Sequence, residues 1–485
     1  MHELLPGSTL INANTKALNA PLISISTDSR KIKNNDFFIA IRGDTFDGNQ
    51  FLNEVFDKGA IGALASNTDS IPQHGTVLIV KDTLEALQQI AKQWRIELGT
   101  TIAVVTGSNG KTTVKEMIAS IFREAFGEDK SLATLGNLNN EIGLPLTLLS
   151  LHRLHQAAVI ELGMNHPGET QFLANIAQPN IALINNAQRE HQEFMHTVEA
   201  VAIEHGDVIK ALQPTGVAIY PADSEYTPLW KKLSQHCSSI SFELSKEKTS
   251  SASTAFGYWL SDGLLEIHIP KLGEGTQANV MKVKLSTLGD HNAKNAIAAA
   301  AVAHAAKIDP LAICRGLENF TPVAGRMRSH QLPHFGELGQ LIDDTYNANP
   351  DSVLAAIDVL VTLPGTRWLI LGDMGEVGDK GDVFHEEIGL YAKSKGIQRL
   401  YATGDLSIRA VEAFQSSNDG SASEKKHQAM HFSEPMDLLK FLKTELHTHQ
   451  SQMSLDPVVV LVKGSRFTKM ERIVNGLLKE ESLCF

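Results

Sequence analysis

The hydrophobic positions change their spacing along the chain, and each spacing predicts a different element. Residues 101–106, "TIAVVT", form a continuous apolar run typical of a buried strand. In the stretch that follows, from Val114 to Ala125, apolar residues recur every three or four positions, which predicts a helix with one buried face. Further strand-like runs occupy residues 157–163 and 180–186. Strands that alternate with helices in this way predict a parallel sheet with helices on both sides.

The segments on either side of this pattern predict two further units. The first hundred residues mix short strands and helices, with an apolar run at 36–43 and helical spacing at 84–94. Two stretches between residues 264 and 285 alternate with a period of two, which is typical of an antiparallel flank. From about residue 331 strands and helices alternate regularly, without the glycine pattern G-x-G-x-x-G.

We therefore predict an α/β protein of three domains, which also suits a length of 485 residues. The expected limits are 1–98 for a small N-terminal α/β domain, 99–327 for a central parallel-sheet domain and 328–485 for a C-terminal Rossmann-like domain. The polar stretch "SSNDGSASEKK" at 416–426 predicts a surface loop within the third domain.

Charge and cysteine content exclude several classes of function. With 43 basic and 55 acidic side chains the formal net charge is −12, which argues against a partner such as nucleic acid or an acidic membrane. The three cysteines are widely separated, which argues against a disulfide framework or a zinc site and fits a reducing compartment. The first residues do not resemble a secretory signal, and the apolar stretches are shorter than a membrane span. We expect a cytoplasmic protein with no membrane insertion.

The segment "VVTGSNGKTT" at 104–113 has the strand–loop–helix context of a phosphate-binding loop. The common loop reads G-x-x-x-x-G-K-[ST], but here Val105 takes the place of the first glycine. Backbone N–H groups and a helix N-terminus hold phosphate in such loops. The candidate ATP contacts are therefore Gly107, Ser108, Asn109, Gly110, Lys111, Thr112 and Thr113. The alternative is an ordinary strand-to-helix turn. On the phosphate-binding interpretation the central domain is a P-loop ATPase domain.

Two of these residues and one later carboxylate are candidates for the chemistry. Lys111 is expected on the β- and γ-phosphates, and the Thr112 hydroxyl is expected to bind Mg²⁺. Glu161 stands at the end of a predicted strand, where ligands gather in parallel sheets, so it is a second candidate for binding the metal. For Glu161 a solvated strand end is an equally good interpretation of the sequence alone.

A series of motifs in a fixed order carries a resemblance to a known family. The motifs are "TGSNGKTTVKE", "NLNNEIGLPLTLL", "VIELGMNHPGE", "LGDHNAKNAIAAAA", "AGRM", "DDTYNANPDS", "LGDMGEVGD" and "VKGSR". Over essentially its whole length the chain resembles the Mur ligases, the ATP-dependent amide-forming enzymes of peptidoglycan precursor synthesis. The shortened glycine loop is the usual form in that family. The resemblance implies an N-terminal domain for a UDP-sugar peptide, a central domain for ATP and Mg²⁺, and a C-terminal domain that closes over both.

Two of the motifs imply a particular reaction. "DDTYNANPDS" and "LGDMGEVGD" look most like the family members that add D-alanyl-D-alanine to UDP-N-acetylmuramoyl-tripeptide. The implied reaction uses ATP to convert the tripeptide carboxylate to an acyl phosphate, which the dipeptide amine attacks to give the pentapeptide. A carboxylate is a poor electrophile, and phosphorylation gives it a leaving group, so the chemistry is reasonable. We expect the enzyme to act as a monomer.

The resemblance also implies roles for residues whose type alone would not establish them. His191 is expected to be a catalytic, metal-binding residue, Asn295 to lie near the nucleotide base, and Arg326 and Asp344 to contact the nucleotide. The implied substrate contacts are Ser29, Arg30, Asn139, Asn349, Lys463, Ser465 and Arg466. By residue type alone, Asn295 and Asn349 would be helix caps and Arg326 a surface ion pair.

One departure from the family pattern bears on the mechanism. Fourteen residues after His191 the family commonly has a lysine that is carbamylated, so that an added carboxylate acts on the metal, but this chain has His205. A histidine cannot carry that stable carbamate, although its neutral ring can bind a metal or hydrogen-bond to other ligands. The neighbouring Glu204 and Asp207 are expected to point elsewhere. We hypothesise that this protein needs no carbamylated lysine; a solvated helix histidine is the alternative for His205.

Two other functions stay open on the sequence. A different Mur ligase or a folylpolyglutamate synthetase would share the architecture, but the Asn-Pro-Arg element expected of the diamino-acid-adding relative is not found. A P-loop ATPase without ligase chemistry is less compatible with three domains and with polar residues at the strand ends of both later domains.

Overall fold

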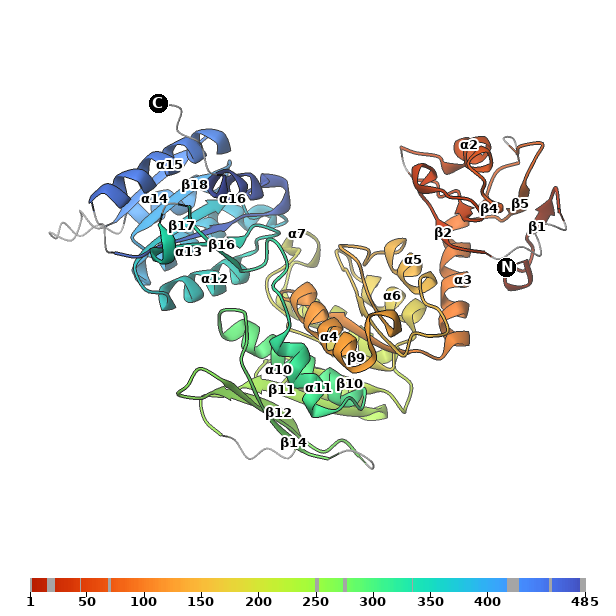
Figure 1. Ribbon diagram of the computed structural model, residues 1–485, viewed down its shortest axis with the longest axis horizontal. Helices are drawn as coiled ribbons and strands as arrows, with labels where there is room; N and C mark the ends of the chain where they lie inside the picture. Colours follow the sequence, from red (N-terminus) through yellow and green to blue (C-terminus); the bar gives the residue numbers. More distant parts are fainter. Residues whose placement is uncertain are drawn as a thin grey trace.

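A computed structural model of the protein describes residues 2–14, 22–43, 45–68, 71–248, 253–273, 277–333, 335–416, 427–452 and 456–479. These residues form three α/β units, each built on its own sheet, as the sequence predicts (Figure 1). The central unit lies between the other two, with the N-terminal unit on one side and the C-terminal unit on the other (Figure 1). The predicted limits at residues 98/99 and 327/328 stay predictions.

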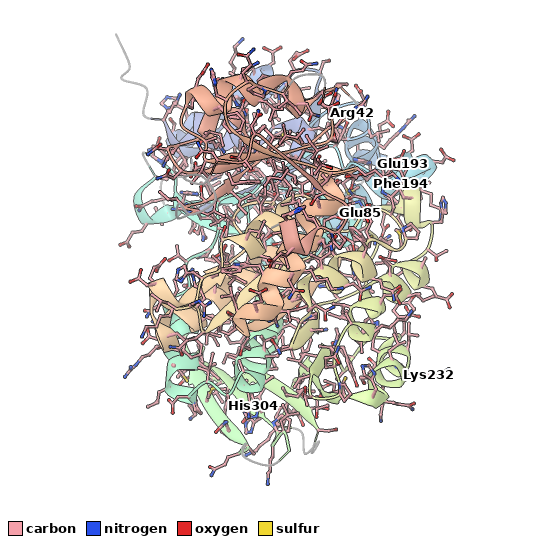
Figure 2. All side chains as sticks on the ribbon, turned by 90° about the vertical axis from the view of Figure 1, so that its right-hand side faces the viewer. Arg42, Glu85, Glu193, Phe194, Lys232 and His304 are labelled. Carbon is pink, nitrogen blue, oxygen red and sulfur yellow. The ribbon has the colours of Figure 1, made fainter. Side chains whose placement is uncertain are left out.

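The first unit is a five-stranded sheet in the order β1-β5-β4-β3-β2, parallel except for β1. Its strands are β1 (Thr9–Ile11), β2 (Ile25–Ser26), β3 (Phe37–Ile39), β4 (Gly62–Ala65) and β5 (Thr76–Ile79). The apolar run predicted at 36–43 gives only the short strand β3. The helix α2 (Leu52–Asp57) packs on one face and α3 (Thr83–Leu98) on the other. The viewpoint of Figure 2 faces this unit, with Arg42 near one end of the molecule and His304 of the central unit near the other.

Helix α3 joins the first unit to the central unit. The Asp82 side chain caps its start by accepting hydrogen bonds from the N–H groups of the first turn. Leu87 and Ile90 belong to the core of the first unit, whereas Ala91 belongs to the core of the central one. Near its end, buried Arg95 donates hydrogen bonds to the carbonyl oxygen of Gln178 and to other oxygens of the central unit. The helix is thus anchored at both ends.

The central sheet has nine strands in the order β14-β13-β12-β11-β10-β9-β6-β8-β7. They are β6 (Thr101–Thr106), β7 (Ser131–Ala133), β8 (Ala157–Glu161), β9 (Ile181–Ile184), β10 (Val217–Pro221), β11 (Ser238–Leu244), β12 (Thr254–Trp259), β13 (Leu265–Ile269) and β14 (Asn279–Val283). The antiparallel flank predicted from period-two alternation is confirmed in β13 and β14. The parallel strands β10 to β12 were not predicted.

Helices cover both faces of the central sheet. On one face lie α4 (Lys111–Phe126), α10 (Asp290–Ala305) and α11 (Pro310–Glu318), and on the other α5 (Gly143–Leu149), α6 (Glu169–Ala177), α8 (Val198–Lys210) and α9 (Thr227–Leu233). The alanine-rich middle of α10 is fully buried, since its small side chains allow close packing against α4 and the sheet. The segments that follow β6, β8 and β9 line a cavity together with residues of the C-terminal unit.

The third sheet has six strands in the order β15-β16-β20-β17-β18-β19, parallel except for β15. Its strands are β15 (Arg328–Gln331), β16 (Gly339–Asp344), β17 (Thr366–Gly372), β18 (Arg399–Thr403), β19 (Gln428–Phe432) and β20 (Val458–Lys463). The helices α12 (Pro350–Thr362), α13 (Gly381–Ser394) and α14 (Ile408–Ser416) cover one face, and α15 (Pro435–Gln452) and α16 (Glu471–Leu478) the other. Ser416 ends α14, and the rest of the loop predicted at 416–426 lies outside the described residues.

Within the described parts of the chain, every helix is too short or too polar to cross a membrane.

Candidate active site

The loop between β6 and α4 has the backbone that a phosphate cradle requires. Gly107 has a φ of 137° and Gly110 a φ of 78°, both in the region that favours glycine. A Cβ atom on Gly110 would come within 2.8 Å of the Asn185 side chain and 2.9 Å of the Asn295 side chain. Glycine is thus needed there for conformation and for space. The helix α4 starts at Lys111, so its first N–H groups face the loop.

Three amide side chains that follow β9 fix the outer part of this loop. Asn186 accepts a hydrogen bond from the Asn109 N–H at 2.8 Å, and both Asn185 and Asn186 donate to the Asn109 carbonyl oxygen at 2.8 Å. The side-chain oxygen of Gln188 accepts from Asn109 Nδ2 at 2.8 Å, and the Gln188 backbone N–H donates to the Ser108 hydroxyl at 2.9 Å. The loop is therefore held before any ligand arrives. The sequence motif identified the loop but not these partners, whose only signal is that they follow a neighbouring strand.

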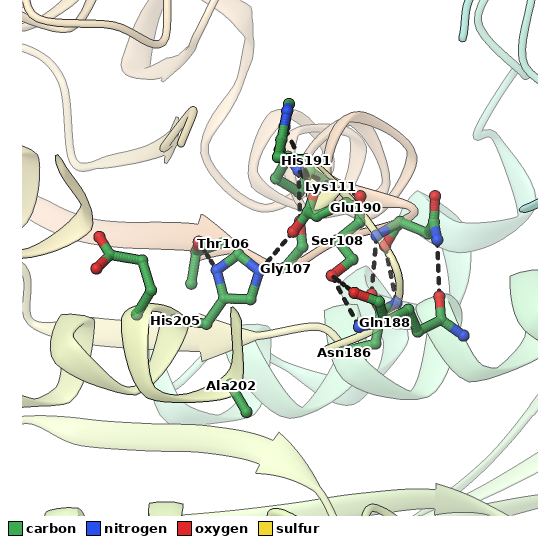
Figure 3. Close-up of polar contacts among 12 residues, drawn as sticks. Thr106, Gly107, Ser108, Lys111, Asn186, Gln188, Glu190, His191, Ala202 and His205 are labelled. Carbon is green, nitrogen blue, oxygen red and sulfur yellow. Dashed lines mark hydrogen bonds and ion pairs between the residues drawn. The ribbon is translucent and has the colours of Figure 1, made fainter. Parts of the chain in front are cut away.

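Behind the loop lies a buried row of polar side chains (Figure 3). His205, in α8, is fully buried: Nε2 donates to Glu190 Oε1 at 2.8 Å, and Nδ1 shares a hydrogen bond with the Thr106 hydroxyl at 2.8 Å. The other oxygen of Glu190 lies 3.3 Å from Lys111 Nζ. Lys111 also donates to the carbonyl oxygens of Gly107 and Ser108. The solvated alternative for His205 is therefore wrong.

Glu190 is ionised in this row. Burial by itself raises the pKa of Glu190, but the Lys111 ammonium and the hydrogen bond from His205 outweigh burial and hold the pKa far below its usual range. Glu204, the neighbour of His205, points elsewhere as expected and accepts hydrogen bonds from the N–H groups of Gly168 and Thr170 at the start of α6.

The two predicted oxygen ligands for magnesium lie side by side. Thr112 Oγ1 donates to Glu161 Oε2 at 2.9 Å, and Asn139 Nδ2 donates to Glu161 Oε1 at 2.9 Å. Glu161 is buried, so the solvated interpretation is wrong. Among the described residues no three His, Cys, Asp or Glu side chains are grouped closely enough to hold a metal alone. This pair still fits Mg²⁺, which takes one or two protein oxygens and completes its shell with water and phosphate.

Polar residues of the C-terminal unit face the loop. Lys463, at the end of β20, donates to Asp344 Oδ2 at the end of β16 at 2.6 Å. Asn349 caps α12 with its side chain and also donates to Asn109 Oδ1 in the loop at 2.9 Å. Asn349 therefore both caps its own helix and contacts the central unit.

Arg326 lies in the connection between the central and C-terminal units. Its guanidinium stacks on the Tyr346 ring at 4.1 Å, and its buried Nε finds no hydrogen-bond partner among the described residues. A buried, unpaired guanidinium N–H that lines a cavity is suited to an anionic ligand.

These groups surround one cavity of about 600 Å³ between the central and C-terminal units. The lining includes the loop from Ser108 to Thr113 and Glu161 on one side, and Arg326, Asp344 and Lys463 on the other. The cavity therefore joins a phosphate cradle, a pair of magnesium-type oxygens and a second polar wall.

Three family models match consecutive parts of the chain. "Mur ligase family, catalytic domain" matches residues 22–95, "Mur ligase middle domain" matches 105–303, and "Mur ligase, glutamate ligase domain" matches 325–466. The chain belongs to the Mur ligase family. The expectation of a ligase is thereby confirmed, and the three matched ranges follow the order of the three sheets.

Single relatives agree with the family models over nearly the full length. This Mur ligase is 35% identical over 472 residues to the UDP-N-acetylmuramoyl-tripeptide–D-alanyl-D-alanine ligase of Haemophilus influenzae, covering 96% of this chain and 95% of the relative. The crystal structure of MurF from Acinetobacter baumannii has a TM-score of 0.81 at 30% identity, over 95% of this chain and 94% of that one. MurF ligase from Thermotoga maritima, crystallised with ADP, shares the fold with a TM-score of 0.76 at 24% identity, over 95% of this chain and 98% of that one.

His191 of this Mur ligase lies close to one carboxylate of its own central unit and one of the C-terminal unit. It has a φ of 46° at the start of the short helix α7 (Gln192–Met195), and its ring lines the cavity. Nδ1 lies 2.6 Å from Glu376 Oε2 of the C-terminal unit, and Nε2 lies 3.8 Å from Glu190. The contact with His191 holds the pKa of Glu376 below its usual value. Glu376 belongs to the motif "LGDMGEVGD" but was not among the predicted site residues.

Several predicted site residues of the Mur ligase lie outside the described lining of the cavity or are already bonded. Ser465 is buried, donates to the Ala348 carbonyl oxygen at 2.9 Å and accepts from the Gly375 N–H at 2.7 Å, so its hydroxyl ties loops together. Arg466 is exposed and stacks over Tyr346 at 5.6 Å. Asn295 hydrogen-bonds to Asn185 and Asn292. Asn139, predicted to contact substrate, lines the cavity and donates a hydrogen bond to Glu161.

The predicted contacts of the first unit lie on its surface. Arg30, in the short helix Ser29–Lys31, has 85% of its side chain exposed and pairs with Asp28 through two hydrogen bonds of 2.8 and 2.9 Å. That contact lowers the pKa of Asp28 to about 2. The described lining of the cavity does not include Ser29 or Arg30.

Proposed function

We propose that this Mur ligase adds D-alanyl-D-alanine to UDP-N-acetylmuramoyl-tripeptide, with ATP converted to ADP and phosphate. The observation that carries the proposal is the single cavity in which the phosphate loop of the central unit faces Asp344 and Lys463 of the C-terminal unit. A ligase needs such an arrangement, because the phosphoryl donor, the carboxylate and the amine must meet in one place. The relatives from Haemophilus influenzae and Acinetobacter baumannii support the choice of substrates.

In the first step the tripeptide carboxylate attacks the γ-phosphorus of ATP, the bond from that phosphorus to the β,γ-bridging oxygen breaks, and an acyl phosphate and ADP form. The N–H groups of the glycine loop and the Lys111 ammonium neutralise charge that spreads over the phosphoryl oxygens. Thr112 and Glu161 would hold Mg²⁺, which screens the β- and γ-phosphates from the attacking carboxylate. Asn139 keeps the Glu161 carboxylate oriented through the 2.9 Å hydrogen bond.

In the second step the dipeptide amine attacks the acyl carbon, phosphate leaves and an amide bond forms. Asn349 and Lys463 are placed to orient the incoming dipeptide, because both line the cavity opposite the loop. The unpaired Nε–H of Arg326 is suited to the nucleotide or the transferred phosphate, and Asp344 to a ribose hydroxyl. Asn295 would lie near the nucleotide base and His191 would bind a metal ion, whereas Ser465 is bonded to Ala348 and Arg466 stacks over Tyr346.

The first unit would hold the UDP part of the tripeptide substrate through Ser29 and Arg30. A closing movement that brings this unit toward the cavity would join the two ends of the substrate site. We further propose that the enzyme acts as a monomer in the cytoplasm, where ATP and UDP-sugar precursors are found, with no nucleic-acid partner or membrane insertion.

The test is phosphate release from ATP in the presence of UDP-N-acetylmuramoyl-tripeptide, with D-alanyl-D-alanine or single amino acids added in turn. Release that depends on the dipeptide, with a pentapeptide product identified by mass, supports the proposal. Release with a single amino acid would make the protein a sister ligase with the same mechanism. Acceptor-independent hydrolysis alone would contradict ligase chemistry with these substrates.

A further inference from the structure

The buried row behind the phosphate loop contains two residues to which the reaction above gives no role. Glu190 follows β9 and its amide-rich turn, and His205 lies in the middle of α8, yet the two side chains meet at 2.8 Å (Figure 3). Glu190 is 5% exposed and His205 is fully buried. Burying a carboxylate costs free energy unless it is paired and hydrogen-bonded, so this placement needs a compensating partner.

Lys111 is that partner. One Glu190 oxygen accepts from His205, which leaves the other oxygen free to face Lys111 Nζ at 3.3 Å. His205 in turn is fixed from its other side by Thr106, the last residue of β6 before the loop. The row thus runs from Thr106 through His205 and Glu190 to Lys111. Both ends of the row belong to the same strand–loop–helix segment.

We propose that Glu190, anchored by His205, is a positioning residue that holds the Lys111 ammonium at the mouth of the phosphate loop. This inference rests on the proposed function, since Lys111 is there the group that neutralises the transferred phosphoryl. Glu190 keeps the free enzyme's lysine paired and folded against the loop carbonyl oxygens, and a nucleotide phosphate competes with the carboxylate for the same ammonium. Phosphoryl transfer depends steeply on the position of the Lys111 ammonium. Glu190 is therefore expected to affect kcat more than it affects the Kd for the nucleotide.

The geometry predicts that loss of the Glu190 charge changes ADP binding and turnover in opposite directions: binding becomes tighter and turnover becomes slower. In Glu190→Gln the side chain keeps its size but loses its charge, so one competitor for Lys111 and one negative charge near the phosphates disappear. Without magnesium, in EDTA, the Kd for ADP is expected to fall about threefold or more, because like-charge repulsion is removed. In the presence of all substrates kcat is expected to fall at least about tenfold, because the ammonium is no longer fixed in place. If Glu190 only stabilised the fold, Glu190→Gln would weaken ADP binding and also lower kcat.

Conservative and combined variants separate the anchor from the group that it anchors. Glu190→Asp keeps the charge, so its Kd for ADP is expected to stay near the wild-type value. His205→Gln is expected to lower kcat less than Glu190→Gln does, because the carboxylate still faces Lys111. Since His205 acts through Glu190, the double variant is expected to be no slower than Glu190→Gln alone.

His385 provides a matched control for loss of a buried histidine. It is also fully buried, and it is hydrogen-bonded to the Gly381 carbonyl oxygen and the Met374 N–H in the C-terminal unit. His385→Gln is expected to lower the Tm as His205→Gln does, but to leave the Kd for ADP unchanged.

The experiment measures the Kd for ADP by calorimetry, the Tm, and kcat and KM for each variant, after the wild type has been tested for dipeptide-dependent phosphate release. Tighter ADP binding with slower turnover in Glu190→Gln, and non-additive loss in the double variant, support the positioning role. Unchanged or weaker ADP binding in Glu190→Gln, or losses that multiply in the double variant, overturn it. If the wild type shows no dipeptide-dependent release, the proposed function fails, and the ADP measurements still decide the role of Glu190.

Discussion

The phosphate loop and the segment around Arg30 are both expected to contact a nucleotide, but they are built in opposite ways. In the loop, Asn109 and Lys111 are each held by several partners, and the polar groups behind them are buried. Arg30 is largely exposed, and its described side-chain partner is Asp28, two residues away. The loop is organised before its ligand binds, whereas the first unit offers a surface that other groups must complete.

This difference indicates which region contributes mainly to catalysis and which contributes mainly to substrate binding. Fixed dipoles and charges lower a barrier because they need no reorganisation when charge moves. An exposed guanidinium is screened by water and contributes little to any single contact. Substitutions on the loop side are therefore expected to change kcat strongly, and those near Arg30 to change KM weakly.

The largest effect is expected from Lys111→Ala. The loss of the ammonium removes the charge that neutralises the transferred phosphoryl, so kcat should fall by about 10³-fold or more. Lys111 begins α4 and its ammonium compensates the buried Glu190 carboxylate, so its removal should also lower the free energy of unfolding, by about 1–3 kcal/mol. Steady-state kinetics and thermal unfolding check both points. The matched control is Lys232→Ala, an exposed lysine on α9 (Figure 2). A fall in kcat of less than about tenfold in Lys111→Ala would contradict the charge-neutralising role of the ammonium.

Glu161→Gln is expected to have the next largest effect. The amide keeps the shape of the side chain but removes the charge that would hold Mg²⁺ beside Thr112, so kcat should fall by about 10²-fold. The magnesium concentration for half-maximal rate should rise at the same time, which a titration with MgCl₂ measures. Glu318→Gln, at the exposed end of α11, is the control. An unchanged magnesium requirement would place the metal elsewhere.

The contact between the central and C-terminal units is expected to matter at an intermediate level. Arg189 Nη2 lies 2.6 Å from Asp351 and Nη1 lies 2.7 Å from Glu387, both in the C-terminal unit. Arg189→Ala should raise KM for the dipeptide about tenfold, because partly buried charge-assisted pairs that hold the closed cavity are lost. ADP binding alone should not change.

Arg409→Ala is the control for Arg189→Ala, because Arg409 also pairs with two carboxylates but within one unit. Equal effects of the two substitutions on KM would contradict a role for Arg189 in holding the units together.

The sequence predicted those parts of the site that depend on local pattern. The loop, Lys111 and Thr112 follow from a contiguous motif, and Glu161 follows from the rule that ligands gather at the carboxyl ends of parallel strands. The fold class followed from alternation of strands and helices. In each case the residues that decide the structure are close together in the chain.

The rest of the site depends on contacts between distant segments, which a single sequence does not reveal. Thr106 and His205 meet across 99 positions, and Glu376 reaches His191 from another unit. Ser465 has a residue type suited to ligand binding, but two backbone groups satisfy its hydroxyl. Which polar side chain is free to bind a ligand is a property of the packed structure.

Arg30→Ala tests the weaker side of the comparison. We expect KM for UDP-N-acetylmuramoyl-tripeptide to rise only about threefold, because an exposed ion pair contributes little. The Kd for ADP should not change. Lys31→Ala, in the same short helix, is the control, since Lys31 lies 3.9 Å from Asp28 and is similarly exposed. Loss of ADP binding in Arg30→Ala would mean that the first unit takes part in the ATP site, and the contrast between the two regions would fail.

The smallest effect is expected from added bicarbonate. It tests whether the polar groups around the phosphate loop function without a carbamylated lysine. A carbamate needs a lysine amine, but position 205 carries a histidine whose partner Glu190 already supplies a carboxylate in the buried row. Added bicarbonate should therefore leave the turnover of the wild type unchanged, at low pH and at low magnesium as well. The double variant Glu190→Gln/His205→Lys removes that carboxylate and adds an amine, so it alone should gain activity with bicarbonate. Stimulation of the wild type by bicarbonate would show that another amine is carbamylated. The unmodified side chains around the phosphate loop would then not be sufficient for full activity.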